Sequence, residues 1–153
     1  MNFEPKKLIE RLRSQLNRQG LPNLSGWLIA QVHGDYNPVG DHYQIHLHVL
    51  SVGNVGIAIE GLRGIAPYRP GEVKRPILRR AATNLMSRVP YYVAQPFWPM
   101  RISLPGGKRT SRRRLPPDRL ADWLMWIDEQ RFSDLIWLHG CSIQAGKLVA
   151  KHA

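Results

Sequence analysis

Two histidines that are separated by a single residue, His46 and His48, stand within residues 43–50 of this 153-residue chain. Successive side chains of a β-strand point to opposite faces, so this spacing places both imidazoles on one face if the segment is a strand. Imidazole is a common ligand of first-row metals, and two rings on one strand make half of a metal site. The alternative is a polar pair on a solvated sheet face. The intervening residues should bury the strand from its other side: Ile45, Leu47 and Val49.

The segment before the histidine strand has the composition of a partner strand. Residues 25–36 read as a strand with Gln31, His33 and Asp35 on one face and Leu28, Ala30 and Val32 on the other, and the turn-forming sequence Asn-Pro-Val-Gly-Asp follows at residues 37–41. A β-hairpin folded at this turn places His33 opposite His46, and residues that lie directly opposite share a face. Asp35 is then expected on the same face.

The hairpin therefore predicts a divalent-metal site without sulfur ligands. Its predicted members are His46, His48, His33 and Asp35. Nitrogen and oxygen donors of this kind suit Mn²⁺ or Mg²⁺, and zinc is a further option. For His33 and Asp35 the alternative is the polar end of an ordinary hairpin, and a register shift of one residue would separate the four side chains.

Residues 43–50, with His46 and His48 at their centre, resemble the His-hydrophobe-His strand of the HUH endonucleases. This superfamily includes plasmid rolling-circle replication initiators, relaxases and small single-strand transposases. His-Gly-Asp-Tyr at residues 33–36 is similar to the preceding strand of the plasmid initiators, and the resemblance covers roughly residues 27–98. It implies a sheet-based fold related to the RNA-recognition, ferredoxin-like fold. It also implies a tyrosine nucleophile on a later helix that cleaves single-stranded DNA through a 5′-phosphotyrosine link.

The residues that the resemblance offers as nucleophiles are Tyr92 and Tyr91. A phenol, with a pKa of about 10, is a poor nucleophile at neutral pH and needs a polarised phosphate. The family's helix usually carries Tyr-x-x-Lys, and the same spacing from Tyr92 leads to Gln95, which brings no charge. Arg88 is a substitute cation, and Pro90 is a second departure from the pattern. The alternative for both tyrosines is packing in the core or at an interface.

Positive charge is concentrated in one part of the chain. The net charge is +11, and residues 73–117 contain no Asp or Glu. A field of one sign attracts a polyanion, so these cations are the predicted nucleic-acid contacts. Trp98 and Tyr68 flank basic residues and are candidates to stack bases, with core packing as the alternative. The eleven cations are Lys74, Arg75, Arg79, Arg80, Arg88, Arg101, Lys108, Arg109, Arg112, Arg113 and Arg114.

The remaining segments predict the elements around the hairpin. The expected order indicates one α+β domain over residues 1–153, with a mainly antiparallel sheet flanked by helices, a basic loop over 105–116 and a helical region over 117–153. Trp123 and Trp126 are expected in its core. Helices are expected over residues 6–18, 54–62 with Asn54 as N-cap, 84–95, 117–132 and 134–140, and strands over 25–36, 42–52, 73–80 and 98–104.

Composition limits the class of protein. A hydrophobic fraction of 43% and a charged fraction of 22% are typical of a globular chain. No apolar run approaches the ~20 residues of a membrane helix, and the N-terminus lacks the apolar core of a secretory signal. The single cysteine, Cys141, excludes an internal disulfide and a cysteine-built zinc site. We therefore expect a cytoplasmic protein without a membrane partner.

Three hypotheses for function follow from these features. The first is a metal-dependent nuclease that nicks single-stranded DNA and transfers strands, as replication initiators do. The second is a degenerate, non-catalytic module that binds DNA or RNA on the same scaffold. The third is an interaction protein whose basic segment holds an acidic partner. Self-association and a replication or mobilisation partner stay open, while the lack of a Walker motif excludes the usual helicase motor.

Overall fold

The computed structural model describes residues 3–69, 76–78, 98–103 and 110–151, and its α+β class is the one predicted. The sheet is mixed and mostly antiparallel, with the strand order β2-β1-β3-β4 and with β5 also paired to β1. The elements are α1 (Pro5–Arg18), η1 (Leu21–Asn23), β1 (Gly26–Asn37), β2 (His42–Gly53), α2 (Gly56–Gly61), η2 (Leu62–Gly64), η3 (Ala66–Tyr68), β3 (Met100–Ser103), β4 (Thr110–Arg113), α4 (Pro117–Asp128), α5 (Phe132–Leu135), β5 (Ile136–His139), β6 (Cys141–Gln144) and β7 (Lys147–Ala150).

Helix α1 forms where the apolar spacing predicted a helix. Ile9, Leu12 and Leu16 are buried and recur at helical intervals on one stripe. Pro5 occupies the first turn, where its missing N–H removes no intrahelical bond. Gly20 follows the helix with a φ of 82°, a left-handed conformation that glycine adopts without strain. The helix therefore presents one apolar stripe to the sheet.

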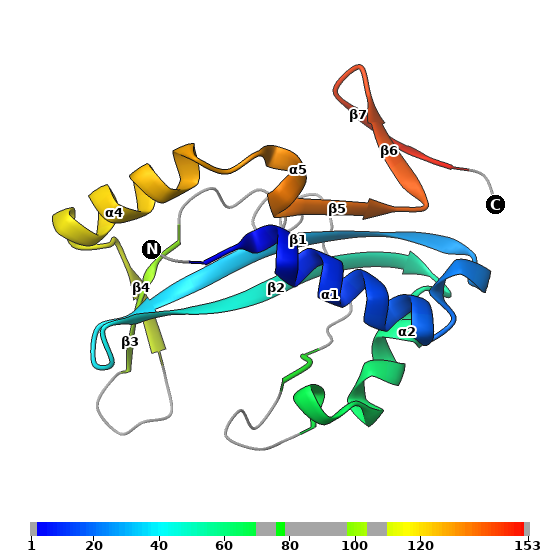
Figure 1. Cartoon of the computed structure of the whole chain (residues 1–153), viewed down its shortest axis with the longest axis horizontal. Helices are drawn as coiled ribbons and strands as arrows, with labels where there is room; N and C mark the ends of the chain where they lie inside the picture. The colour runs from blue at the N-terminus through cyan, green and yellow to red at the C-terminus, as the bar shows by residue number, and fades with distance from the viewer. Residues whose placement is uncertain (1–2, 70–75, 79–97, 104–109, 152–153) are drawn as a thin grey trace.

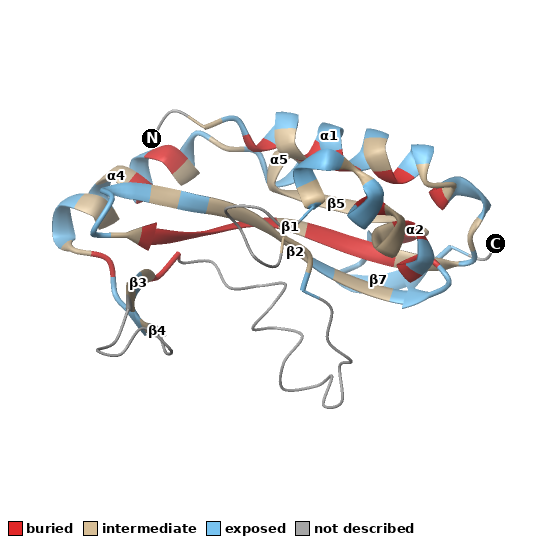
Figure 2. Cartoon of the chain, turned by 90° about the horizontal axis from the view of Figure 1, so that it is seen from below, coloured by how far each residue is buried: buried red, intermediate tan, exposed pale blue. Residues whose placement is uncertain are grey.

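The helices cover one face of the central hairpin. Leu12 and Leu16 of α1 belong to a buried cluster with Leu28 and Ala30 of β1. Further along β1, Val32 packs in a second cluster that contains tryptophans of α4. Figure 2 shows α1, α4 and α5 on the same side of the β1–β2 hairpin. The side chains at odd-numbered positions of β1 point to the opposite face.

The hairpin has the register that the sequence predicted. His33 pairs with His46, Gln31 with His48, and Asp35 with Gln44. The pairing continues without a bulge from Gly26↔Gly53 to Asn37↔His42. The predicted shared face of the histidines is therefore confirmed.

The expectation that the histidine strand is buried is wrong in one respect. Strand β2 is an edge strand among the described strands, and most of its residues are half-buried or exposed, whereas β1 is buried along most of its length (Figure 2). The exposed fraction of Val49, on the helix-covered face, is 38%. Strand β1 lies inside the sheet and β2 at its edge, so His33 is buried more deeply than His46 and His48.

Strand β1 pairs with two further strands along its other side. Strand β5 runs antiparallel to Leu28–Gln31, and β3 runs parallel at the single pair Tyr36↔Met100. The helix expected over residues 134–140 is wrong, because Ile136–His139 forms β5 and helix α5 ends at Leu135. Pairing with β1 gives this segment four residue pairs in the sheet. The hydrogen bonds of these pairs stabilise the strand more than a short isolated helix would be stabilised.

Two parts of the chain form strands where none was expected. Residues 110–113, within the expected basic loop, form β4 and pair with β3. The C-terminal region expected to be helical contains the β6–β7 hairpin, whose turn places Ala145 at φ 48° and Gly146 at φ 74°. This hairpin extends away from the main sheet in Figure 1. The Ala-Gly pair is a weaker turn signature than Asn-Gly, which is why the hairpin was missed.

The segment after β2 differs in detail from the expectation. The N-cap residue of helix α2 is Val55 and not Asn54 as expected, and the helix has no side-chain cap. The side-chain amide of Asn54 instead donates to Ser25 Oγ at 3.1 Å. Residues 76–78 are not in a strand, and the rest of the strand expected over 73–80, with the helix expected over 84–95, lies outside the described residues. In the described part of the chain, no helix combines the length and apolar character needed to span a membrane.

Candidate metal centre

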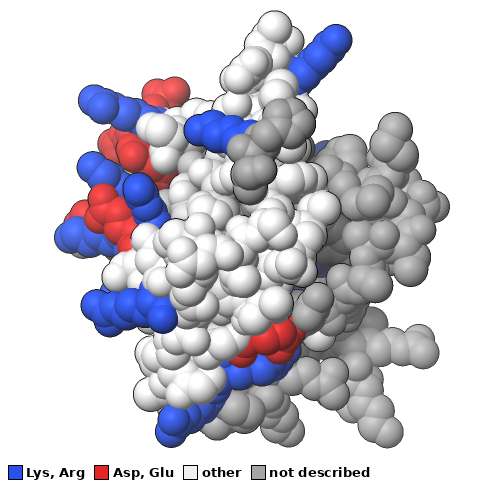
Figure 3. Space-filling view, turned by 90° about the vertical axis from the view of Figure 1, so that its right-hand side faces the viewer, with Lys and Arg blue, Asp and Glu red and all other residues white. Residues whose placement is uncertain are grey.

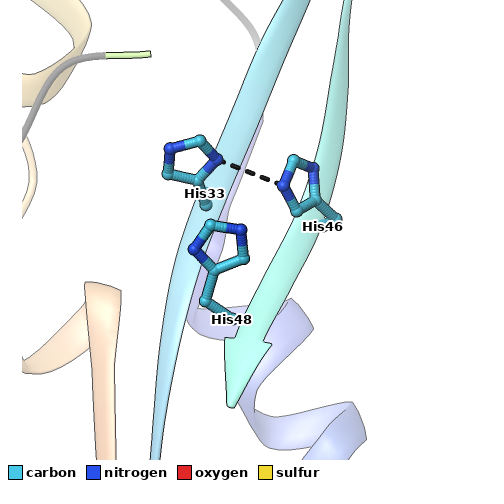
Figure 4. Close-up of side chains that lie close together, drawn as sticks. All are labelled: His33, His46 and His48. Atoms are coloured by element: carbon cyan, nitrogen blue, oxygen red, sulfur yellow. Dashed lines mark hydrogen bonds between the residues drawn. The ribbon is translucent and has the colours of Figure 1, made fainter. Parts of the chain in front are cut away.

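Three histidine side chains converge on the face of the hairpin opposite the helices. His33 comes from β1, and His46 and His48 come from β2. One ring nitrogen from each can be chosen so that all three atoms lie within 4.8 Å of one another (Figure 4). The His33 and His48 rings stack with centroids 4.4 Å apart and an interplanar angle of 13°. The three rings are therefore close enough to ligate one metal ion.

The cluster is buried on one side and open on the other. Only 1% of His33 is exposed, whereas His46 and His48 are half-buried on the edge strand. This gradient follows from the positions of β1 inside the sheet and β2 at its edge. An ion at this place would be held against the sheet and approached from the side of β2.

Hydrogen bonds orient the ring of His46. Its Nδ1 lies 3.1 Å from the Gln44 carbonyl oxygen, which can only accept, so Nδ1 carries the proton and Nε2 keeps a lone pair. That lone pair faces His33 Nδ1 at 3.1 Å. A ring N–H held by a backbone carbonyl is the usual second bond of a metal-ligating histidine. Nε2 of His46 is therefore the nitrogen that a metal would bind.

The separation of these two nitrogens tests whether an ion fits between them. Metal–nitrogen bonds of about 2.1 Å separate neighbouring ligand atoms by roughly 3.0 Å in an octahedral shell and roughly 3.4 Å in a tetrahedral one. The observed distance between His33 Nδ1 and His46 Nε2 is 3.1 Å. The separation matches that of two ligand atoms, but the two nitrogens face each other across a hydrogen bond, so an ion enters only when that bond breaks and the rings turn towards it. Binding would require His33 to carry its proton on Nε2 instead of Nδ1.

Asp35 lies on the same face but is not part of this group of three. Its exposed fraction is 2%, and its Oδ2 is 3.5 Å from Nη1 of Arg101 on β3. Its Oδ1 is buried without a hydrogen-bond partner in the described structure. The predicted four-residue site therefore becomes three histidines, with the carboxylate of Asp35 placed between them and an arginine.

Trp98 closes the side of β1 beside the cluster. Between the part of β1 that pairs with β5 and the pair at Tyr36, the Trp98 ring packs on Gly34, where an added Cβ would be 2.6 Å from a ring atom. The Trp98 ring centroid is 6.3 Å from that of His33. A glycine inside a strand marks such close approach, so Gly34 is the signal in the sequence that could have revealed this packing.

Two of the predicted basic residues point to this face. Arg101 lies opposite Arg112 in the β3–β4 pair, so both point to the face of Asp35. Arg113 and Arg114 are exposed. The side of the molecule in Figure 3 differs, because basic and acidic side chains are interspersed there.

Several predicted residues cannot be placed. The candidate nucleophiles, Tyr91 and Tyr92, lie outside the described residues. So do seven of the eleven predicted nucleic-acid contacts, namely Lys74, Arg75, Arg79, Arg80, Arg88, Lys108 and Arg109.

The tryptophans Trp123 and Trp126 are in the core as expected, with 2% and 4% of their surface exposed.

A cluster at the tip of the hairpin was not anticipated. The Tyr36 hydroxyl donates to Asp41 at 2.7 Å, and Arg119 of α4 forms an ion pair with the same carboxylate at 2.7 Å. The bond to Asp41 raises the pKa of Tyr36 above its usual value, and burial raises that of Tyr43, whose hydroxyl donates to the Arg119 carbonyl. These contacts fasten the hairpin to α4. No local pattern in the sequence links residues so far apart.

Comparisons with known proteins assign this chain to no family. The chain matches no protein-family model, no curated protein and no solved structure. Functional inference must therefore start from the three histidines and their surroundings.

Proposed function

We propose that this protein is a metal-dependent enzyme of the HUH type that nicks single-stranded DNA and transfers strands, as replication initiators do. The observation that carries the proposal is the convergence of His33, His46 and His48 within 4.8 Å. Support comes from Arg101 and Arg112, which point to the same sheet face on neighbouring strands. The α+β sheet with helices on one face is compatible with the ferredoxin-like arrangement that this function implies.

The donor set narrows the choice of metal. The cluster offers three imidazole nitrogens, and Asp35 does not join it. Mg²⁺ prefers a shell of oxygen ligands, whereas imidazole suits the first-row transition metals. We therefore favour Mn²⁺ or Zn²⁺ over Mg²⁺. When bound, such an ion would polarise the scissile phosphate and stabilise charge on the departing oxygen.

The chain's own groups supply the other parts of the reaction. We assign the nucleophile to Tyr92, with Tyr91 as the neighbouring candidate. Its phenolic oxygen attacks phosphorus as it loses its proton, the bond from phosphorus to the 3′-oxygen breaks, and that oxygen takes up a proton. The products are a 5′-phosphotyrosine and a free 3′-hydroxyl. Arg101 and Arg112 bind neighbouring phosphates of the DNA backbone.

A binding module without catalysis is the second candidate. The observation that favours it is Gln95, which stands where the Tyr-x-x-Lys pattern of the superfamily has its cation. A neutral amide cannot stabilise charge on a phosphate as an ammonium group does. In this case the chain would bind the metal and single strands but would form no covalent adduct.

Metal binding is the first test of the proposal. Titration calorimetry with Mn²⁺ and Zn²⁺ is expected to give one site in the wild type and none in His48→Ala. His42→Ala is the matched control, because His42 is an exposed histidine of the same strand, six residues before His48. Loss of metal binding in neither variant would overturn the histidine site.

Covalent chemistry is the second test. The protein is incubated with Mn²⁺ or Zn²⁺ and a pool of single-stranded oligonucleotides, and the products are separated on a denaturing gel. We expect a protein–DNA adduct that Tyr92→Phe abolishes, or that Tyr91→Phe abolishes if the neighbour attacks. Metal binding without an adduct for any oligonucleotide would refute the nuclease and establish the binding module.

A further inference from the structure

A pocket lies between the Trp98–Pro99 segment, the end of β4 and the beginning of α4. Its volume is about 560 Å³, within the range of pockets that hold small ligands. Its described lining combines apolar and cationic side chains. They are Trp98, Pro99, Arg112, Arg113, Arg114, Leu115 and Leu120.

The apolar part of the pocket is rigid. Trp98 and Leu115 are 4% and 8% exposed. The Trp98 ring lies 5.0 Å from that of Trp126 and 5.9 Å from that of Tyr43, measured between centroids. A preformed wall of this kind spares a ligand the free-energy cost of ordering it.

The remainder of the lining is positively charged. Arg112, Arg113 and Arg114 are consecutive and exposed. The nearest acids along the chain, Asp118 and Asp122, form ion pairs with Arg119 at 3.8 and 3.3 Å. The pocket therefore favours a ligand with one apolar surface and at least one negative charge.

We propose that this pocket holds one nucleotide of a single-stranded nucleic acid. The base packs against the apolar wall of Trp98, Leu115 and Leu120, and the phosphates on either side of it are bound by Arg113 and Arg114. The choice of a nucleic-acid strand rests on the proposed function. The inference goes further by naming a base-binding pocket away from the histidine face.

The position of Trp98 connects this pocket with the histidines. The same ring lines the pocket and lies 6.3 Å from the ring of His33, between centroids. Trp98, Leu115 and Leu120 pack together on the helix-covered face, so a base held there lies across the sheet from the histidine face. An acidic peptide offers carboxylates but no repeated aromatic surface, so it matches the charged half of the pocket and not the apolar half.

The test measures binding without metal, so that it stays independent of the nuclease reaction. Fluorescence anisotropy in EDTA follows a labelled twelve-nucleotide thymidine strand and an abasic strand of the same length. We expect the thymidine strand to bind several-fold more tightly, because only a base brings apolar surface that the pocket can bury. Leu120→Gln is expected to reduce that preference, while circular dichroism confirms that the variant is folded.

Charge variants test the other half of the pocket. Arg113→Gln and Arg114→Gln are each expected to weaken binding of both strands several-fold and to reduce its salt dependence. Arg131→Gln is the matched control, an exposed arginine beyond the far end of α4. Equal binding of the two strands, unchanged affinity in the pocket variants, or full competition by polyglutamate would overturn the nucleotide pocket. None of these outcomes depends on metal binding or on adduct formation.

Discussion

Replacing Gly34 by alanine is expected to disturb the packing that connects the histidine cluster to the core. An added Cβ would lie 2.6, 2.8 and 3.0 Å from three atoms of the Trp98 ring. Gly34 is not among the residues with positive φ, so alanine brings no backbone strain there. The whole effect should therefore come from contact with Trp98.

The size of the effect follows from how little the ring can move. Carbon atoms in contact are normally about 3.5–4.0 Å apart, so the indole would have to retreat by roughly 1 Å. Trp98 is 4% exposed, and Trp126 lies 5.0 Å from it between ring centroids. Overpacking of a tight core costs about 1–3 kcal/mol, and we expect a loss of about 2 kcal/mol.

Urea denaturation followed by circular dichroism measures this loss as a change in the free energy of unfolding. Gly64→Ala is the matched control, because no atom lies within 4 Å of its added Cβ. That variant should be as stable as the wild type or more stable by up to about 1 kcal/mol, since alanine restricts the unfolded chain. An unchanged dependence on urea concentration would show that both variants unfold from a comparable native state.

A double-mutant cycle identifies the contact. Trp98→Leu removes the ring that alanine would meet, so the loss in Gly34→Ala/Trp98→Leu should be smaller than the sum of the two single losses. Gly34→Ala with a free energy of unfolding within about 0.5 kcal/mol of the wild type would refute the packing of Trp98 on Gly34.

Two further predictions concern charged groups. Arg101→Ala is expected to lower the free energy of unfolding by about 1–3 kcal/mol, because the Asp35 carboxylate, 2% exposed, loses the guanidinium at 3.5 Å; thermal denaturation against Arg131→Ala checks this, and equal stability would contradict it. The hydrogen bond to Asp41 raises the pKa of Tyr36 in the folded protein. The stability that this bond contributes is complete below about pH 10 and is lost as the pH rises through the pKa that Tyr36 has in the folded protein. When the pH is raised from about 9 to 11, the free energy of unfolding should therefore fall less in Tyr36→Phe than in the wild type. Urea denaturation at each pH measures this fall.

The hairpin could be predicted because several local features agreed. The turn sequence at residues 37–41 fixes where the chain reverses, and a register shift of one residue would move Leu28 and Ala30 from the core to the histidine face. The pairing of His33 with His46 follows from these two constraints alone. The three-histidine cluster was therefore accessible from the sequence.

Features that depend on distant residues were not accessible. The place of β2 at the sheet edge is set by β3 and β5, which pair with β1 on its other side. Asp35 was correctly assigned to the histidine face, but its partner Arg101 follows 66 residues later in the chain. Strand β5 forms because β1 offers it a partner, and local propensity does not reveal that partner.

The charge around the histidines couples the proposed metal site to the proposed nucleic-acid contacts. The described residues supply three nitrogen atoms close enough to bind one ion. A bound dication would add two positive charges to the face on which Arg101 pairs with Asp35. Strands lie about 4.8 Å apart and each residue rises about 3.3 Å, so Arg101, two strands away from His46 and four residues further along the sheet, is roughly 16 Å from it, a span that one phosphodiester strand covers with a few nucleotides. A polyanion would balance this excess charge, so we expect metal and single-stranded DNA each to increase the affinity for the other.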